Sequence, residues 1–366
     1  MSRNTTDMHF QPFNHLLTTN KKASRQLRRL AKLFALVALL VCTPNIYSQK
    51  HYITNQYVYD LYLMNPAAAA FYKDCFIANA YVQKQWFGTD GSPSTQILSA
   101  QAALNENLGS GTYIYNDQNG NFKEMGLQQT FSYEVLVSQN SRSKGFTKLR
   151  FGVSLDLERS SLSYNNLSAG SQLDPAIVGG NESGWGFNAN TGVILLINRF
   201  HTGFSLTNLI SQPNSMFESE LEPKTPLDMH FYAGSTFKVS DIELFIEPMI
   251  YYRRNTNVES RMDVNVKLTM PTLDDNLSFW GLLAYRRTMD KDAGVDLGSA
   301  VTLGAVYRRI NLGLEYQFGL TSAQQNYGSY FQLIVGYRFC RDRFNGAIEC
   351  PGEKKGKRIN EKYISY

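Results

Sequence analysis

Apolar and polar residues alternate along most of this chain, from about residue 74 to Phe339. In residues 149–158 and 310–320 every second residue is apolar, and the residues between are polar, small or charged. A period of two is that of a β-strand, whose successive side chains point to opposite faces. These strands run to about ten residues, carry charge on the second face, recur to the C-terminus and follow a secretion signal. A soluble sandwich does not require that combination, which predicts a transmembrane antiparallel β-barrel.

The alternation defines about 14 strand candidates, and an even number suits a single-chain barrel with both termini in the periplasm. Tyrosine and phenylalanine, 22 of each, supply aromatic girdles for the two membrane interfaces. We therefore predict an all-β fold with a barrel over residues 74–339. The strands are expected to be centred near residues 78, 98, 113, 131, 152, 192, 205, 233, 247, 265, 282, 303, 315 and 334.

The links between these strands alternate in length, as the periplasmic turns and external loops of a barrel do. Short links fall near residues 105–107, 199–200, 240–241 and 308–309, and a modest one at 271–275. Between them come long polar stretches, which we assign to the outside of the cell. They cover residues 159–184, 210–227, 289–296 and 320–328.

Residues 1–48 have the form of a signal peptide that is removed. Basic residues between Lys21 and Lys32 precede an apolar run from Leu33 to Cys42, and Ser48 offers a small residue for cleavage. An uncleaved anchor helix would need about 20 apolar residues, twice the length of this run. The segment contains seven of the 36 basic and one of the 31 acidic residues, so the mature chain has a formal net charge of −1. This balance gives no electrostatic case for nucleic-acid binding.

Two segments flank the predicted barrel. Residues 49–73 form a short periplasmic lead-in, in which Asn65-Pro66 initiates a turn before an alanine run. That run is also compatible with a short helix that enters or plugs the barrel. Residues 340–366 form a periplasmic basic tail. Cys340 and Cys350 bracket a short polar link at its start and are expected to form a disulfide, which leaves Cys75 free.

Charged residues fall on the face of the strands that would point inward. Facing lipid, Arg or Lys would cost about 2–4 kcal/mol at mid-bilayer. A hydrated lumen with mutually paired charges explains them, and so does a selectivity lining for a pore. They include Asp156, Glu158, Glu243, Glu247, Asp263 and Lys267.

Several short motifs in order resemble the PorP/SprF family of type IX secretion-system outer-membrane proteins. They lie at residues 62–67, 83–88, 91–95, 116–120 and 149–152. The resemblance implies an outer-membrane barrel of a Gram-negative bacterium of the Bacteroidota, in contact with outer-membrane lipid. It also implies a role in gliding or protein secretion, with other secretion components and a surface adhesin or cargo as partners.

The clearest family resemblance suggests a partner-binding set in the lead-in and the first external loop. An exposed tryptophan beside a glycine is the kind of residue that anchors an interface. The alternative is that the tryptophan belongs to the girdle and the Asn-Pro turn seats the lead-in against the barrel. The set comprises Asn65, Pro66, Lys84, Gln85, Trp86 and Gly88.

No pattern in the sequence predicts an enzyme. The three mature histidines, His51, His201 and His230, share no predicted site, and no Gly-x-Ser-x-Gly or His-Glu-x-x-His motif occurs. No metal or cofactor is implied. The alternatives to a secretion component are a general porin or small-solute channel, and a barrel hydrolase with a scattered triad.

Overall fold

The computed structural model describes twelve stretches of the chain, all within one compact unit, Ile46–Tyr366. The predicted signal peptide and the basic tail after Cys340, with Trp86, Gly88 and Cys350, lie outside the described residues, and Cys340 itself belongs to the wall. Among the described residues, no helix has the length and hydropathy to cross a membrane. The described stretches are residues 56–72, 75–85, 91–140, 145–163, 181–213, 216, 224–239, 243–256, 260–274, 276–289, 296–319 and 329–340.

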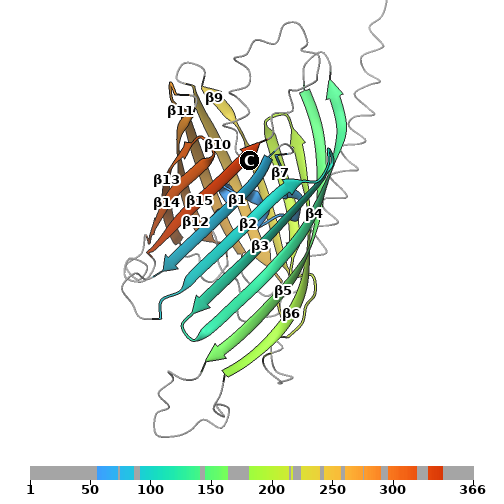
Figure 1. Ribbon diagram of the computed structural model, residues 1–366, viewed down its shortest axis with the longest axis vertical. Helices are drawn as coiled ribbons and strands as arrows, with labels where there is room; N and C mark the ends of the chain where they lie inside the picture. The colour runs from blue at the N-terminus through green and yellow to red at the C-terminus, as the bar shows by residue number, and fades with distance from the viewer. Residues whose placement is uncertain are drawn as a thin grey trace, which may run out of the picture. The chain divides into compact units, whose positions relative to one another are not determined.

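A single antiparallel sheet closes on itself to form the barrel (Figure 1). Each strand pairs with the next, except that β8 and β9 both pair with β10, and the last strand pairs with the first along its whole length. The strands are β1 Cys75–Gln85, β2 Ser94–Ala103, β3 Leu108–Asn119, β4 Phe122–Asn140, β5 Gly145–Ser163, β6 Asn181–Ile197, β7 Phe200–Thr207, β8 Asp228–Ser235, β9 Phe237–Val239, β10 Leu244–Asn255, β11 Ser260–Pro271, β12 Leu277–Thr288, β13 Asp296–Tyr307, β14 Ile310–Phe318 and β15 Tyr330–Cys340.

Strands β8 and β9 are two parts of one wall strand. Both pair with β10, and only Thr236 separates them. The wall therefore has 14 strands, which confirms the predicted barrel, and each predicted strand centre falls within an observed strand.

The two faces of the wall have opposite chemistry. In β15, Gln332 and Ile334 are fully buried inside the barrel, whereas Phe331, Leu333 and Val335 are exposed on the outside. The same pattern of exposed apolar side chains recurs from strand to strand. Because water cannot satisfy backbone groups in a bilayer, a closed wall with an apolar outer face is the form that strands need to cross it.

The connections distinguish the two ends of the barrel. We call the end with Cys75 and Cys340 the turn end, and the opposite end the loop end. Most of the longer gaps between strands, such as those from Ser163 to Asn181 and from Thr207 to Asp228, begin and end at the loop end, as expected. A two-residue turn at Gly120 is an exception at that end, and its left-handed backbone (φ 58°) favours glycine. Strands β5 and β6 extend into the stretch 159–184 that we expected to be loop.

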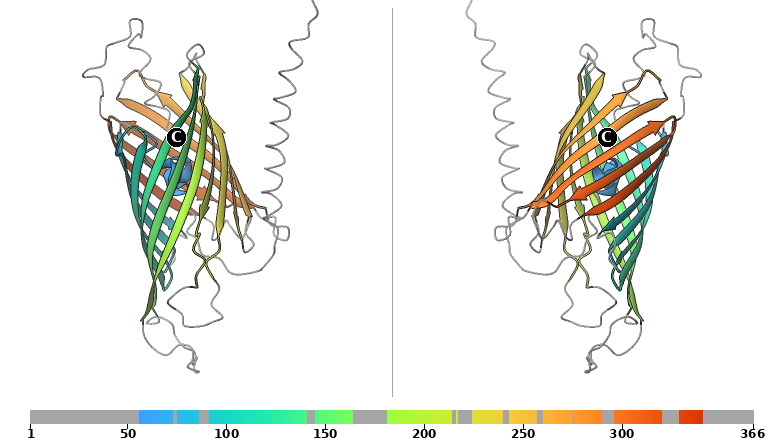
Figure 2. Two further views of the ribbon diagram at one scale, coloured as in Figure 1. Left: turned by 90° about the vertical axis from the view of Figure 1, so that its right-hand side faces the viewer. Right: turned by 90° about the vertical axis from the view of Figure 1, so that its left-hand side faces the viewer.

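The described part of the lead-in lies inside the barrel (Figure 2). Residues 56–72 form three short 3-10 helices, η1 Gln56–Val58, η2 Leu61–Leu63 and η3 Pro66–Ala68. Their side chains form a buried cluster with inward residues of the wall such as Tyr81, Tyr232 and Ile334. Of the two readings of the alanine run, the plug is correct for these residues, and we call residues 56–72 the plug.

The cysteine pairing differs from the expected one. Cys340 forms a disulfide with Cys75, and the two residues are directly opposite each other in the β1–β15 pair. The expected Cys340–Cys350 disulfide is therefore wrong in this structure, as is the expectation that Cys75 is free. Sequence separation favoured the nearer cysteine, whereas closure of the barrel brings together two residues that are 265 positions apart.

Candidate functional site

The plug fits into the barrel because several inward positions of the wall that face it closely are glycines. At Gly152, an added Cβ would lie within 3.0 Å of backbone atoms of Pro66 and Ala67, a distance that real Cβ atoms do not adopt. The same holds for the other members of this set against plug atoms. We call them the glycine cradle, and they are Gly109, Gly111, Gly152, Gly192 and Gly336.

Arg150 of β5 binds the C-terminal half of the plug through hydrogen bonds. Its guanidinium donates hydrogen bonds to the carbonyl oxygens of Ala67 (2.8 Å) and Ala69 (2.7 Å). A third bond, 2.8 Å long, joins it to the carboxylate of Glu134 on β4. Arg150 is only 2% exposed. A buried guanidinium needs such partners because removing a charge from water costs several kcal/mol.

Asn65 fixes the start of η3. Its side-chain oxygen accepts a hydrogen bond from the Ala67 N–H (2.9 Å), which is the N-cap arrangement. Its amide nitrogen donates to the carbonyl oxygens of Val193 and Phe204, both at 3.3 Å. The side chain is fully buried. The Asn-Pro pair thus acts as a turn that seats the plug.

Asp60 anchors the N-terminal half of the plug. Its carboxylate accepts hydrogen bonds from Asn79 (3.0 Å), Tyr81 (3.2 Å) and Gln101 (3.0 Å), all on β1 and β2. Burial raises the pKa of the Asp60 carboxyl above its ordinary value, and the hydrogen bonds that it accepts oppose this rise. The plug therefore binds the wall through several separate clusters.

Tyr57 begins the plug on the other side of the lumen. Its hydroxyl donates to Asp263 on β11 (2.5 Å) and accepts from Asn265 (3.1 Å). Asp263 is held in turn by the guanidinium of Arg261 through bonds of 2.7 and 2.6 Å. On β11, the inward charges of Arg261 and Asp263 are thus paired with each other.

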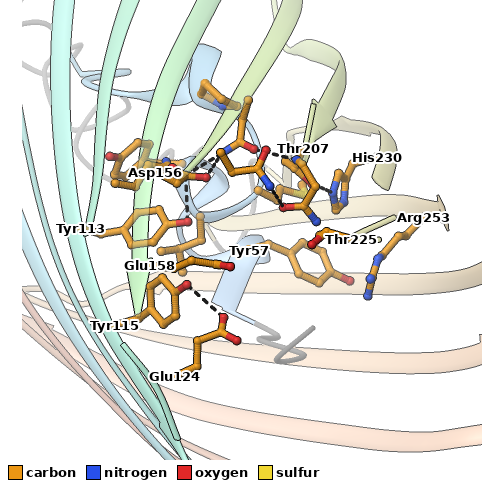
Figure 3. Close-up of a pocket in the computed structure, with 18 of the residues that line it drawn as sticks. Tyr57, Tyr113, Tyr115, Glu124, Asp156, Glu158, Thr207, Thr225, His230 and Arg253 are labelled. Carbon is orange, nitrogen blue, oxygen red and sulfur yellow. Dashed lines mark hydrogen bonds between the residues drawn. The ribbon is translucent and has the colours of Figure 1, made fainter. Parts of the chain in front are cut away.

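A cavity of about 100 Å³ lies between the plug and the loop end. Tyr113, Tyr115, Glu124, Asp156 and Glu158 form one side of it, and His230, Thr207, Thr225 and Arg253 form the other, with Tyr57 between them (Figure 3). Arg253 is paired with Asp228 at 2.9 Å. The lining is polar and mixed in charge, which is suited to holding water or a small polar group.

Among the described residues, no cluster of three or more His, Cys, Asp or Glu side chains has the arrangement of a metal site. His230 contacts the hydroxyls of Tyr251 (2.8 Å) and Thr207 (3.0 Å). His230 is directly opposite Ser205 in the β7–β8 pair, and the Ser205 hydroxyl donates a hydrogen bond to the carbonyl oxygen of Met64 in the plug at 2.7 Å.

Most of the chain matches a known protein family. A family model described as type IX secretion system membrane protein PorP/SprF matches residues 46–337. The chain belongs to the PorP/SprF family. The match covers the plug and nearly all of the barrel, so both are parts of the PorP/SprF region of the chain. Family and barrel together support a location in an outer membrane.

Solved structures similar to this PorP/SprF protein are other barrels, with low similarity. A Pseudomonas aeruginosa FadL homologue is 13% identical, with a TM-score of 0.40 over 75% of this chain and 92% of its own. The monoaromatic hydrocarbon channel CymD is 12% identical (TM-score 0.43; 81% and 95% covered), and the Ralstonia pickettii toluene transporter TbuX 9% (0.43; 76% and 92%). The search of curated proteins finds no match.

The structure separates the expected partner-binding residues of this PorP/SprF chain. Asn65 and Pro66 are buried in the lumen, so the structural alternative holds for them and they offer no surface to a partner. Lys84 and Gln85 end β1 at the loop end, where Lys84 is exposed. The two groups are therefore not brought together.

The residues that hold the plug were not predicted from the sequence. Arg150 was one of the polar or charged residues that alternate with apolar ones in residues 149–158, and the cradle glycines resembled ordinary small residues of a strand. The available signal was a charged residue on the inward face of β5. One expected inward charge is misplaced, since Glu243 lies in the β9–β10 turn with an exposed side chain paired to Lys238.

Proposed function

We propose that this chain is a non-enzymatic component of the type IX secretion machinery of a Bacteroidota outer membrane. In this role the barrel anchors other secretion components and a secreted surface adhesin or cargo. The observation that carries the proposal is the plug. The plug occupies the lumen and is held there by buried hydrogen bonds, including those of Arg150, which is also ion-paired with Glu134. A barrel filled by its own chain is better suited to binding partners than to conducting solutes.

The second candidate is a general porin or small-solute channel. The mixed charges of the loop-end cavity favour it, because a water-filled lumen needs polar walls. The plug argues against a channel, because its residues are packed against the inward face of the wall. For steady conduction, the hydrogen bonds of Arg150, Asn65 and Asp60 to other parts of the chain would have to break together.

The partner surface of this proposal is the first connection at the loop end. Lys84 and Gln85 lead into it, and Trp86 and Gly88 follow in the sequence. An aromatic residue flanked by charge and glycine is typical of interface anchors. Asn65 and Pro66 leave the proposed set because they are buried in the plug.

The test replaces Trp86 with alanine in the full-length chain. We expect the variant barrel to remain heat-modifiable on gels, while secretion partners no longer co-purify and the dependent surface protein is not exported. Trp185→Ala is the matched control, because Trp185 is an exposed tryptophan at the loop end of β6, beside Arg159. Normal export by Trp86→Ala would contradict the partner surface.

Conductance measurements distinguish the secretion component from the channel. The purified wild-type protein in planar bilayers should show no steady conductance, because the plug fills the lumen. Steady conductance of the wild-type protein, without co-purifying partners, would support the channel instead.

A further inference from the structure

The β4–β5 hairpin continues past its neighbour at the turn end. Strand β3 pairs with β4 only as far as Tyr133, where the partner is Leu108. Strand β4 nevertheless runs on to Asn140, paired on its other side with β5 (Figure 1). Among the described residues, nothing pairs with the β3-facing side of residues 135–140. We call this stretch the open edge.

The backbone direction along the open edge follows from its first anchor. Glu134 donates its N–H to the carbonyl oxygen of Asn107 in the β2–β3 turn, at 2.8 Å. Backbone groups alternate between the two sides of an antiparallel strand with a period of two. The N–H and C=O of Leu136 therefore point to the same, open side, and form the first rung of a ladder that no described strand completes.

The first three side chains of the open edge, Val135, Leu136 and Val137, are apolar, and the last three are polar. Val135 and Val137 are exposed, and Val137 is the extra residue of a bulge between Leu136 and Ser138. Lipid explains outward-facing valines. It does not explain Leu136, which continues the inward row of Thr130 and Glu134 and yet is 50% exposed. An exposed leucine on the lumen side of a rim, next to unpaired backbone, is a feature that proteins normally avoid or cover.

We propose that the open edge binds an extended segment of a secretion partner, which adds a strand beside β4 and covers Leu136 with an apolar side chain. The proposal rests on the proposed anchoring function and assigns it a second surface, at the end opposite Trp86. Strand addition fits because main-chain groups supply the affinity and one pocket supplies selectivity. The partner is thus a polypeptide with an apolar residue in an extended, unpaired stretch.

A second copy of this chain is a poorer occupant. Two barrels in one membrane are related by an axis along the membrane normal. Strands tilted by about 35–45° would then cross at about 70–90°, which prevents a continuous ladder between two open edges. A partner that is free to choose its orientation has no such restriction.

The main test is Leu136→Pro in the full-length chain. Proline removes an N–H that points to the open side, so the pairing with β5 is kept. We expect the barrel to assemble normally and partner recovery to fall about tenfold, as the loss of a main-chain hydrogen bond and of strand register would produce. Leu136→Thr keeps the N–H and should give a smaller loss, and Val135→Ala on the outward face should give none. Recovery of the same partners by Leu136→Pro would overturn the proposal.

A photo-crosslinking residue at position 136 tests the contact directly. This test remains valid if the Leu136→Pro variant does not fold. We expect adducts with an extended segment of a secretion component, and none from a crosslinker at position 133, where β3 pairs with β4 and the side chain points to the outer face. Adducts with a second copy, or no adduct at 136 in an assembled barrel, would overturn the proposal. If the wild-type chain recovers no secretion partner at all, the anchoring function fails, whereas a failure confined to position 136 concerns the open edge alone.

Discussion

At the scale of single residues, function and folding meet in a few buried polar side chains. Arg150 is the clearest case, because it contacts two carbonyl groups of the plug and one carboxylate of the wall. Sequence patterns indicated that it points inward but not what it binds. Its partners are Ala67 and Ala69, about 80 residues away, whose carbonyl groups are common to every residue. A side chain that recognises backbone leaves little trace in the sequence of its target.

We predict that Arg150→Met destabilises the barrel by about 3 kcal/mol, because it removes the ion pair of 2.8 Å between Arg150 and the buried carboxylate of Glu134. The double variant Arg150→Met, Glu134→Gln should lose less than the single one. Urea unfolding in lipid vesicles, followed by tryptophan fluorescence, gives these values. Arg159→Met removes an exposed arginine and is expected to have little effect. Equal losses in the single and double variants would show that the ion pair does not matter.

At the scale of elements, the strands were predictable and the plug was not. Alternation arises wherever one face meets lipid and the other meets a polar interior, so each strand carries its own signal. The helices η1 to η3 have three residues each, too few to show a period. Their position depends on the glycine cradle, whose members come from β3, β5, β6 and β15. Only the folded barrel brings those strands around one segment.

The cradle yields a prediction at this scale. Gly152→Ala places a methyl group against the backbone of Pro66 and Ala67, which cannot move aside as a flexible side chain would. Overpacking of this kind costs about 1–3 kcal/mol, enough to shift the docked fraction of the plug by about tenfold or more. Conductance that appears in planar bilayers with this variant, but not with the wild type, would report the displaced plug. Gly281→Ala is the matched control, because its Cβ would meet its nearest atom at 3.5 Å, an ordinary contact. If the Gly152→Ala barrel shows no conductance, the glycine cradle does not determine the position of the plug.

At the scale of the whole molecule, closure determines what lies near what. The first and last strands meet along eleven residue pairs, from Cys75 opposite Cys340 to Gln85 opposite Tyr330. The plug leaves the lumen at the same end, only three residues before Cys75. The disulfide therefore ties together the exit of the plug and the line where the sheet closes. The number of strands does not predict this arrangement. It predicts a closed barrel but not the register in which the first and last strands pair.

The last prediction concerns this disulfide. Protein isolated without reductant should yield a linked peptide pair that contains Cys75 and Cys340, while Cys350 reacts with an alkylating reagent. The double variant Cys75→Ser, Cys340→Ser should unfold more readily by about 2–5 kcal/mol, since the link restricts the unfolded chain over a loop of 265 residues. Because eleven cross-strand pairs remain, that variant should still close and remain heat-modifiable. A linked Cys340–Cys350 peptide would instead restore the pairing expected from sequence, and would mean that only the strand ladder and the plug hold the first and last strands together.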